Sequence, residues 1–384
     1  MTSASIDPAH DHDDIVYPSS VPFVIVHLAC FAALFTGVSA TSLWLCFGLY
    51  WLRMFGVTAG YHRYFSHRAY AAGRGFQFLL ALLAQSSAQK SVLWWAAKHR
   101  HHHLFSDTEH DVHSPRHTGF FYSHVGWIFA RRHDSVDLNK VEDWTKYPEL
   151  MWLHRYEIVP AVLLGVICFL IDGWTGVIVG FCWSTALVWH GTFCINSLAH
   201  VHGEKRYVTG DDSRNNWLLA IVTMGEGWHN NHHAYQSSAR QGFRWYEFDP
   251  TFYILKALSW TGLVWGLKSP PEAVIRNEQR LGARVIDRAA ADLAASVNVE
   301  AVVLAIRAVP DLAELSQKLA EAQHKAAALL EHLPAPHLPH LPTREELHRR
   351  AVEMYARTPS LDDIVDRAHR MILEKVGARL ASVA

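Results

Sequence analysis

The sequence predicts an all-α integral membrane protein with four transmembrane helices in two hairpins, a cytoplasmic helical cap and a C-terminal helical tail. Three observations predict this fold. Half of the 384 residues are hydrophobic, and they are concentrated in long runs rather than spread along the chain. Lysine and arginine are confined to two blocks, and toward the C-terminus the composition becomes that of a polar helical protein.

Four apolar runs account for the predicted spans. The first pair covers residues 21–39 and 41–60, and the second pair covers 157–171 and 174–198, joined at Asp172-Gly173. A helix needs roughly 20 apolar residues to cross a bilayer. The third run is short and contains Pro160, so we expect its helix to begin nearer Met151.

The charge pattern orients these spans. No lysine or arginine occurs in residues 1–52 or 157–204. Because cytoplasmic loops of membrane proteins are enriched in both residues, residues 53–155 and the chain from Lys205 onward are predicted to be cytoplasmic. Buried helices of a soluble bundle would not explain this segregation. Residues 1–20 lack the basic start and cleavage site of a signal peptide, so we expect a cytosolic tail.

Composition also divides the chain into domains. Residues 21–281 are predicted to form the membrane domain. Residues 282–384 repeat Ala, Leu, Glu and Arg at helical spacing and form a predicted helical tail with a proline-rich joint at 332–342. We assign this tail no chemistry. Residues 75–97 are apolar but carry several polar side chains, and we expect an interfacial or re-entrant helix there.

Three histidine clusters predict a metal centre at the cytoplasmic side. They are His62-x4-His67, His99-x2-His102-His103 and His229-x2-His232-His233. Residues at i, i+3 and i+4 share one face of a helix, so the second and third clusters each present converging imidazoles. His62 and His67 are five residues apart, which fits one α-helical face poorly. We therefore expect that pair at a helix end or an irregular turn just outside the membrane.

The number of imidazoles indicates two metal ions. Eight histidines exceed the three or four protein ligands of one zinc ion, and neutral imidazoles suit iron, copper or zinc. Two adjacent iron ions can use dioxygen to attack an unactivated C–H bond. The five cysteines all lie within the proposed spans and form no CxxC pair, which argues against sulfur ligands.

The clusters carry a specific resemblance. His62-Arg-Tyr-Phe-Ser-His67, His99-Arg-His-His-His103 and Gly225-Glu-Gly-Trp-His-Asn-Asn-His-His233 resemble the three histidine boxes of the membrane fatty acyl desaturases. Gly56-Val-Thr-Ala-Gly60, Gly119-Phe-Phe-Tyr-Ser-His-Val-Gly-Trp127 and Asn196-Ser-Leu-Ala-His200 resemble the stearoyl-CoA (delta-9) branch in particular. The resemblance covers roughly residues 20–265.

The resemblance implies a two-iron site with nine histidine ligands and one asparagine that holds a water. Mapped by motif, these are His62, His67, His99, His102, His103, His200, His229, His232, His233 and Asn196. His101 occupies the variable position of the second box and is left out. Asp107 and His124 are candidates for orienting the ligands.

The resemblance also implies a substrate site. Gln89, Trp95 and Thr192 match residues that line the bend of the acyl tunnel, although packing at the membrane interface would explain them as well. Arg131 and Arg132 match a basic pair that meets the phosphates of coenzyme A, and lipid headgroups are the alternative partner.

The implied activity is an O2-dependent desaturation that leaves a cis double bond, at the delta-9 position of a long-chain acyl-CoA. Ala97-Lys98 replaces the Arg-Asp of animal members, so an acyl group on a lipid or carrier protein is an alternative substrate. No His-Pro-Gly-Gly segment is present. We therefore expect no fused haem or flavin, and electrons from a separate ferredoxin, cytochrome b5 or reductase.

Three other functions remain open from the residues alone. A hydroxylase of the same superfamily would use the same oxidant. A membrane b-type cytochrome would need histidine pairs across facing helices within the bilayer. A metal transporter would need ionisable residues along its spans, where His27 and His190 are nearly the only ones besides cysteine and tyrosine.

Overall fold

The computed structural model describes residues 20–307 and 341–381. The predicted N-terminal tail, apart from Ser20, and the proline-rich joint up to residue 340 lie outside the described residues. The chain divides into two compact units: Met1–Glu204 with Asp212–Pro270, and Lys205–Asp211 with Pro271–Ala384. This division lies close to the composition change near residue 282.

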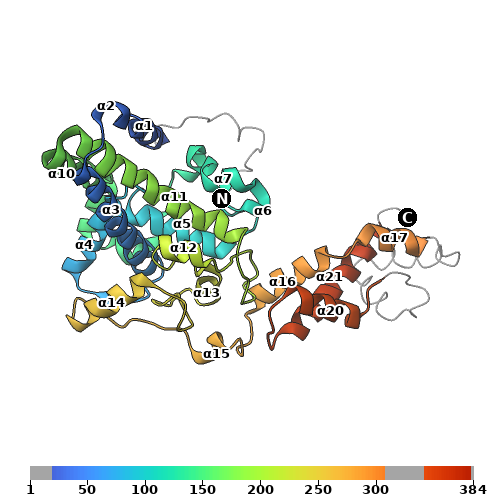
Figure 1. The fold of residues 1–384 in the computed structure, drawn as a ribbon. Helices are drawn as coiled ribbons and strands as arrows, with labels where there is room; N and C mark the ends of the chain where they lie inside the picture. Colours follow the sequence, from blue (N-terminus) through green and yellow to red (C-terminus); the bar gives the residue numbers. More distant parts are fainter. Residues whose placement is uncertain (1–19, 308–340, 382–384) are drawn as a thin grey trace. The chain divides into compact units, whose positions relative to one another are not determined.

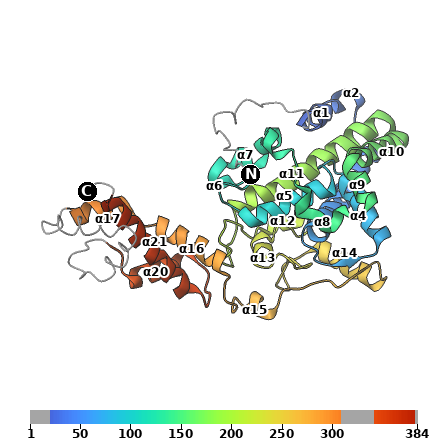
Figure 2. The same ribbon diagram turned by 180° about the vertical axis from the view of Figure 1, so that it is seen from behind.

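The first unit is almost entirely helical (Figures 1 and 2). Its first half contains α1 (Val21–Cys30), α2 (Ala33–Thr36), α3 (Ala40–Phe55), the π-helix η3 (Gly56–Ser66), β1 (Ala71–Ala72), α4 (Arg74–Gln85), α5 (Val92–Phe105), α6 (Pro115–Thr118), α7 (Phe120–His124), η4 (Gly126–Phe129), η5 (Arg131–His133), η6 (Leu138–Val141), α8 (Glu142–Thr145) and α9 (Pro148–Arg155). Its second half contains α10 (Val159–Thr175), the π-helix η7 (Gly176–Trp183), α11 (Ser184–Asn196), η8 (Leu198–His200), α12 (Trp217–Val222), α13 (His229–Ala234), α14 (Pro250–Trp260) and β2 (Val264–Trp265). β1 and β2 pair antiparallel, with Ala71 opposite Trp265.

Two continuous helical stretches are long and apolar enough to cross a membrane: Ala40–Ser66, of 27 residues, and Val159–His200, of 42 residues. At about 1.5 Å per residue the second would be about twice the ~30 Å thickness of the hydrocarbon core. It is broken at Gly173, which has φ +56°. A Cβ on Gly176 would lie 2.2 Å from the carbonyl oxygen of Cys168, so the chain folds back on itself here. The reversal predicted at Asp172-Gly173 is therefore present.

The first predicted span differs from its prediction. The apolar run is interrupted near Phe31, between the end of α1 and the start of α2. The apolar helical segment Val21–Thr36 is shorter than a full membrane crossing requires. Ser39 caps α3 in a reciprocal capping box with Ser42. The hydroxyl of Ser39 also donates to the carboxylate of Asp172. The turns of the two apolar hairpins therefore touch each other.

The outward faces of these helices carry large apolar side chains. Leu34, Phe35 and Leu170 are 83%, 91% and 77% exposed. Exposed apolar surface on this scale is expected where lipid rather than water surrounds a helix. The apolar helices thus fit a membrane protein.

The interfacial or re-entrant helix predicted over 75–97 is interrupted. The chain instead forms α4 and α5 with a break at residues 86–91, where Ala88 and Lys90 have positive φ angles of 57° and 68°. The break is fixed to α11, because the Trp189 indole donates to the carbonyl oxygen of Ser87 at 2.7 Å. A mixed apolar and polar composition does not reveal such a break.

The second unit is a helical cluster with its own buried apolar core. It contains α15 (Glu272–Ile275), α16 (Ala283–Ala295), α17 (Val299–Arg307), α20 (Arg344–Met354) and α21 (Leu361–Ala381). Leu293, Ile306 and Ile372 lie in its core. α16 and α17 together pass as one apolar stretch, but they are bent by 56°. Their apolar faces are buried within the unit.

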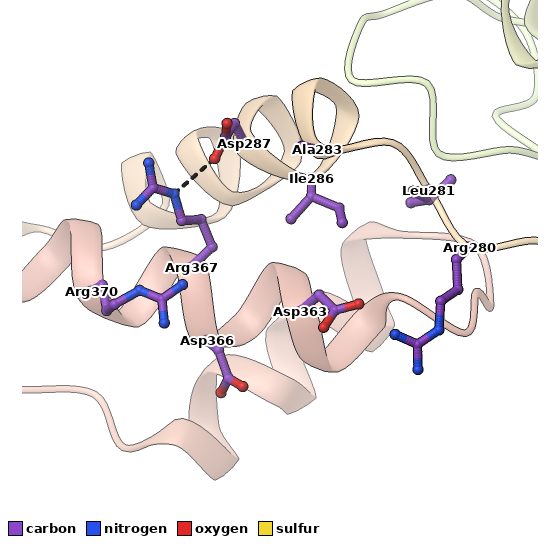
Figure 3. A pocket seen from close by; sticks show the side chains of 9 residues that line it. All are labelled: Arg280, Leu281, Ala283, Ile286, Asp287, Asp363, Asp366, Arg367 and Arg370. Atoms are coloured by element: carbon purple, nitrogen blue, oxygen red, sulfur yellow. Dashed lines mark hydrogen bonds and ion pairs between the residues drawn. The ribbon is translucent and has the colours of Figure 1, made fainter.

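A cavity of about 600 Å³ lies between α16 and α21 (Figure 3). Arg280, Arg367 and Arg370 line it together with Asp287, Asp363 and Asp366. Arg367 donates to Asp287 at 2.8 Å. Basic and acidic groups are balanced, so the cavity has no evident preference for a cation or an anion.

Candidate metal centre

Nine histidines of the first unit gather into two groups in which the ligand nitrogens lie within 4.8 Å of one another. The first histidine group is His62, His67, His99, His103 and His232. The second histidine group is His102, His200, His229 and His233. These nine are the histidines that the sequence motifs had singled out.

The π-helix η3 explains how His62 and His67 reach the same group. Its hydrogen bonds run from i to i+5, so residues five apart lie about one turn apart on one face. The amide of His67 donates to the carbonyl oxygen of His62 at 3.2 Å, and their ring centroids lie 4.8 Å apart. His67 is the C-cap of η3, so the predicted helix end is confirmed. The expectation that His62 and His67 could not share one helical face was wrong, because it assumed α-helical geometry.

The second and third boxes each supply both groups. On α5, His99 and His103 enter the first group and His102 enters the second. On α13, His232 enters the first group and His229 and His233 enter the second. A box therefore does not correspond to one group; α5 and α13 lie between the two.

The nitrogen spacing fits metal coordination. Nε2 of His232 lies 3.0 Å from Nε2 of both His62 and His103, and Nε2 of His99 lies 2.9 Å from that of His67. In the second group, Nε2 of His200 and His229 are 3.0 Å apart. Two ligands at right angles about a metal, each at about 2.1 Å, stand about 3.0 Å apart. The donor set and spacing therefore fit two ions.

Carboxylates lie beside Nδ1 of three of these rings and are hydrogen-bonded to two of them, His102 and His200. Nδ1 of His62 lies 2.5 Å from Glu226, Nδ1 of His102 lies 2.9 Å from Asp111, and Nδ1 of His200 lies 2.7 Å from Asp107. A proton on Nδ1 donates to the carboxylate and leaves the Nε2 lone pair for a metal. Nε2 of His62 and His200 then direct lone pairs at neighbouring imidazole nitrogens, an arrangement that a cation between them would stabilise.

Only part of this carboxylate set was predicted. Asp107 is confirmed as a partner of a site histidine. His124 was wrong, since its ring nitrogens contact Ser197 and His190, which are outside both groups. Asp111 and Glu226 were missed, although Glu226 stands inside the third motif, three residues before His229.

Burial favours the neutral form of five of the site imidazoles. Burial, and secondarily the neighbouring histidines, lowers the pKa of His67, His99, His103, His229 and His232 well below the ordinary value. Burial alone would raise the pKa of Glu226, but His62 and Arg63 outweigh it and the pKa is lowered. The neutral imidazole is the form in which histidine binds a metal.

Arg63 joins the third box to η3. Its guanidinium is fully buried and contacts Glu226 at 3.1 Å and Asp249 at 3.0 Å. Gly225 has φ +116°, and a Cβ there would lie 2.4 Å from Oδ1 of Asp249. Glycine is therefore required immediately before Glu226.

The predicted substrate residues fall near the centre to different degrees. Trp95 stacks on His99 with ring centroids 4.8 Å apart, and Nε2 of Gln89 donates to Oγ1 of Thr192 at 3.2 Å. Arg131 and Arg132 lie on η5. Asn196 ends α11, and the 3-10 turn that follows it carries His200. His101 contacts His110 and Lys140 outside both groups, in agreement with its exclusion.

The fold and the site define a class: apolar helical hairpins that carry two groups of buried imidazoles, as in a membrane metalloenzyme. The fatty acid desaturase family profile matches residues 39–264. The chain belongs to the fatty acid desaturase family, a family of oxidoreductases that act on acyl substrates.

Several characterised relatives are similar over most of their own length. An acyl-CoA 5-desaturase of Anemone leveillei is 35% identical over 251 residues, which are 64% of this chain and 78% of the relative. Delta-9 acyl-lipid desaturase 2 of Arabidopsis thaliana is 36% identical over 257 residues, 66% of this chain and 83% of the relative. An sn-1 stearoyl-lipid 9-desaturase of Anabaena variabilis is 35% identical over 242 residues, 62% of this chain and 89% of the relative.

Proposed function

We propose that the protein is an O2-dependent fatty acyl desaturase that introduces a cis double bond into a saturated long-chain acyl group. The observation that carries the proposal is the convergence of nine imidazoles into two groups in a member of the desaturase family. Membership of this family leaves no support for a b-type cytochrome or a metal transporter.

The reaction removes two hydrogens from adjacent methylenes. One pair of adjacent methylenes, one O2, two electrons and two protons give one carbon–carbon double bond and two waters. Two iron ions bound by the histidine groups would supply the activation of dioxygen for this step. The electrons come from a separate donor such as a ferredoxin, a cytochrome b5 or a reductase.

Each histidine group would hold one ion. The five imidazoles of the first histidine group would be the ligands of one ion. The four of the second histidine group, with Asn196 through a water, would be the ligands of the other. The carboxylates of Glu226, Asp107 and Asp111 support this assignment, because they orient three of the nine rings.

The remaining predicted residues position the substrate. Trp95, stacked on His99, holds the acyl chain close to the centre, and the Gln89–Thr192 hydrogen bond shapes the bend of its channel. A dry, bent channel presents one methylene pair to the oxidant, so regioselectivity comes from positioning. Arg131 and Arg132 bind the phosphates of coenzyme A.

We propose delta-9 position and acyl-CoA as the substrate form, with acyl-lipid as the alternative. The relatives' names include both CoA and lipid substrates and both 5- and 9-positions. We further propose four spans with the histidine groups at the cytoplasmic face, on the positive-inside pattern. In this arrangement residues 21–281 are the membrane desaturase domain and 282–384 a helical tail.

Product analysis tests the proposal. Purified iron-loaded protein is given a reductase system, O2 and either stearoyl-CoA or stearoyl phospholipid, and products are analysed by mass spectrometry. We expect an alkene at carbon 9 from the CoA ester. A hydroxylated chain without alkene would identify a hydroxylase, and alkene from the phospholipid alone would reassign the substrate.

Paired variants connect the activity to the site. His232→Ala removes a ring whose Nε2 lies 3.0 Å from Nε2 of two others of the first histidine group, and it should abolish the activity. His101→Ala, in the same helix as the second box but outside both groups, should retain it.

A further inference from the structure

Three histidines outside both histidine groups form a continuous hydrogen-bonded chain. His27 of α1 contacts His190 of α11 through their Nε2 atoms at 3.0 Å. Nδ1 of His190 then contacts Nε2 of His124 of α7, also at 3.0 Å. Nδ1 of His124 lies 2.9 Å from the hydroxyl of Ser197. We name these four side chains the histidine chain. Both nitrogens of every ring are engaged, so the chain is linear rather than convergent like a metal site.

The two ends of the chain are fixed by backbone carbonyls. Nδ1 of His27 lies 2.7 Å from the carbonyl oxygen of Phe23 and must donate to it. The hydroxyl of Ser197 lies 2.9 Å from the carbonyl oxygen of Phe193. A carbonyl oxygen only accepts, so both ends of the chain need a proton.

Counting protons shows what the chain can hold. It contains five hydrogen bonds, two to carbonyls and three between its own side chains. Each bond needs one proton, whereas three neutral imidazoles and one hydroxyl supply four. All five bonds form only when the chain carries one additional proton as an imidazolium. In a neutral chain one of the five hydrogen bonds lacks its proton. When the position of this missing hydrogen bond shifts along the chain, a proton is transferred.

The surroundings are otherwise uncharged. The ring contacts of the three histidines are with aromatic side chains, including Phe23 and Trp189 for His27 and Phe120 and Phe193 for His124. Apart from one another, these histidines have no titratable hydrogen-bond partner among residues 20–307 and 341–381. No fixed carboxylate therefore traps the proton on one ring.

The buried end of the chain lies in the turn that carries proposed site residues. The rings of His27, His190 and His124 are half-buried, whereas Ser197 is fully buried. Ser197 directly follows Asn196, and the amide of His200 donates to its carbonyl oxygen at 3.2 Å. Ser197 thus belongs to the turn that carries two proposed site residues. The chain therefore runs from half-buried rings to a buried hydroxyl in the turn that carries two proposed site residues, which is the layout of a proton path.

We propose that His27, His190, His124 and Ser197 form a proton-transfer chain that serves the histidine centre. The inference rests on the proposed function, which consumes two protons for every O2 reduced to water. A half-buried ring takes up a proton at one nitrogen, and the other nitrogen of that ring releases one to its neighbour. Ser197 passes one to the water that the proposed function places at Asn196, the residue before it. Only N–H and O–H bonds form and break, and no electron moves.

His190→Gln is the central variant. A glutamine amide can donate and accept a hydrogen bond and so can link α1 to α7, but it cannot relay a proton. His154→Gln is the matched control, because His154 is a half-buried histidine of α9 bonded to Ser91 and lies outside the chain.

The first measurement uses the metal-free protein and does not depend on activity. Histidine N–H protons in strong hydrogen bonds give resonances far downfield in proton NMR. We expect such resonances in the wild type and in His154→Gln. In His190→Gln we expect the loss of those from the histidine chain, whereas those of His102 and His200, which are bonded to carboxylates, should remain. Identical downfield spectra for wild type and His190→Gln would overturn the chain.

The second measurement uses the iron-loaded protein with stearoyl-CoA. Proton transfer by a positioned side chain contributes typically about 10²–10⁴-fold to a rate; with other donors able to replace it in part, we expect His190→Gln to lower alkene formation by about tenfold. We also expect a larger solvent deuterium isotope effect than in the wild type, because proton delivery becomes slower than the other steps. Added imidazole should restore part of the rate in His190→Ala.

The outcomes separate the two proposals. A wild type that is inactive but shows the downfield resonances contradicts the proposed function. The hydrogen-bonded chain is then judged by the NMR comparison with His190→Gln alone. An active wild type matched by His190→Gln in rate and isotope effect contradicts the proton path. A slower His190→Gln with an unchanged isotope effect and no imidazole rescue reduces the chain to a structural link and also overturns the proposal.

Discussion

Glu226 and His62 are joined by a contact of 2.5 Å between the carboxylate and Nδ1 of the ring. Both side chains are buried, and the same carboxylate contacts Arg63 at 3.1 Å. The third histidine box therefore orients a ligand of the first box. The two motifs lie more than 160 residues apart along the chain.

Glu226→Gln is expected to weaken metal binding in the first histidine group. The amide is close in size to the carboxylate but cannot stabilise a proton on Nδ1 of His62 by its charge. Loss of such a partner typically lowers metal affinity or activity about 10–100-fold. Iron per protein, measured by mass spectrometry after dialysis, should fall, whereas Glu149→Gln, on a surface ion pair with Arg74, should keep the wild-type content.

Asp107→Asn is expected to act on the second histidine group instead. Asp107 holds Nδ1 of His200, and both side chains are 1% exposed. If each group binds its own ion, this variant and Glu226→Gln should each retain about one iron, and the double variant should retain almost none. Equal loss of both ions in each single variant would show that the groups bind metal as one unit. Titration with ferrous iron, followed by quantification of the bound metal, separates the two results.

The sequence predicts the ligands better than their arrangement. Helical spacing alone brings together three histidines on α5 and three on α13, and His200 follows only from a family motif. Spacing does not divide the boxes between two groups, because that depends on how α5 and α13 pack. It also misjudged His62 and His67, since the i to i+5 bonding of η3 is not encoded by a recognisable pattern. Asp111 and Glu226 reach their rings through the tertiary fold.

Hairpin positions were predicted more closely than helix continuity. The break at Asp172-Gly173 follows from two residues that stand out in an apolar run. The interruption of α1 and α2 near Phe31 has no such marker, because its neighbours are as apolar as the helices. The break between α4 and α5 depends on positive φ angles at Ala88 and Lys90, residue types that do not usually adopt them.

Gly225→Ala is expected to destabilise the protein more than Gly262→Ala, a substitution at another glycine with positive φ. Both Gly225 and Gly262 have positive φ, but a Cβ at Gly225 would lie 2.4 Å from Asp249, whereas at Gly262 nothing lies within 4 Å. Gly262→Ala should cost only the backbone strain of about 1–2 kcal/mol, and Gly225→Ala should cost roughly 2 kcal/mol more from the displaced Arg63–Asp249 pair. Thermal unfolding in detergent compares the two. Equal midpoints would mean that the ion pair moves aside freely.

Thr192→Val tests whether the hydrogen bond with Gln89 shapes the acyl channel. Valine has nearly the size of threonine, so the variant removes the 3.2 Å bond from Gln89 while retaining the packing of α11. A channel bend held less firmly should position more than one methylene pair, and we expect a mixture of double-bond positions with total turnover reduced by less than about tenfold. Thr175→Val, which removes a bond to the carbonyl oxygen of Thr36 at the hairpin turn, is the control and should give a single product. Fragmentation mass spectrometry of the fatty acids locates the double bond. A single unchanged position in Thr192→Val would exclude the Gln89–Thr192 pair from regioselectivity, since the bond would then be absent without effect on where the substrate lies.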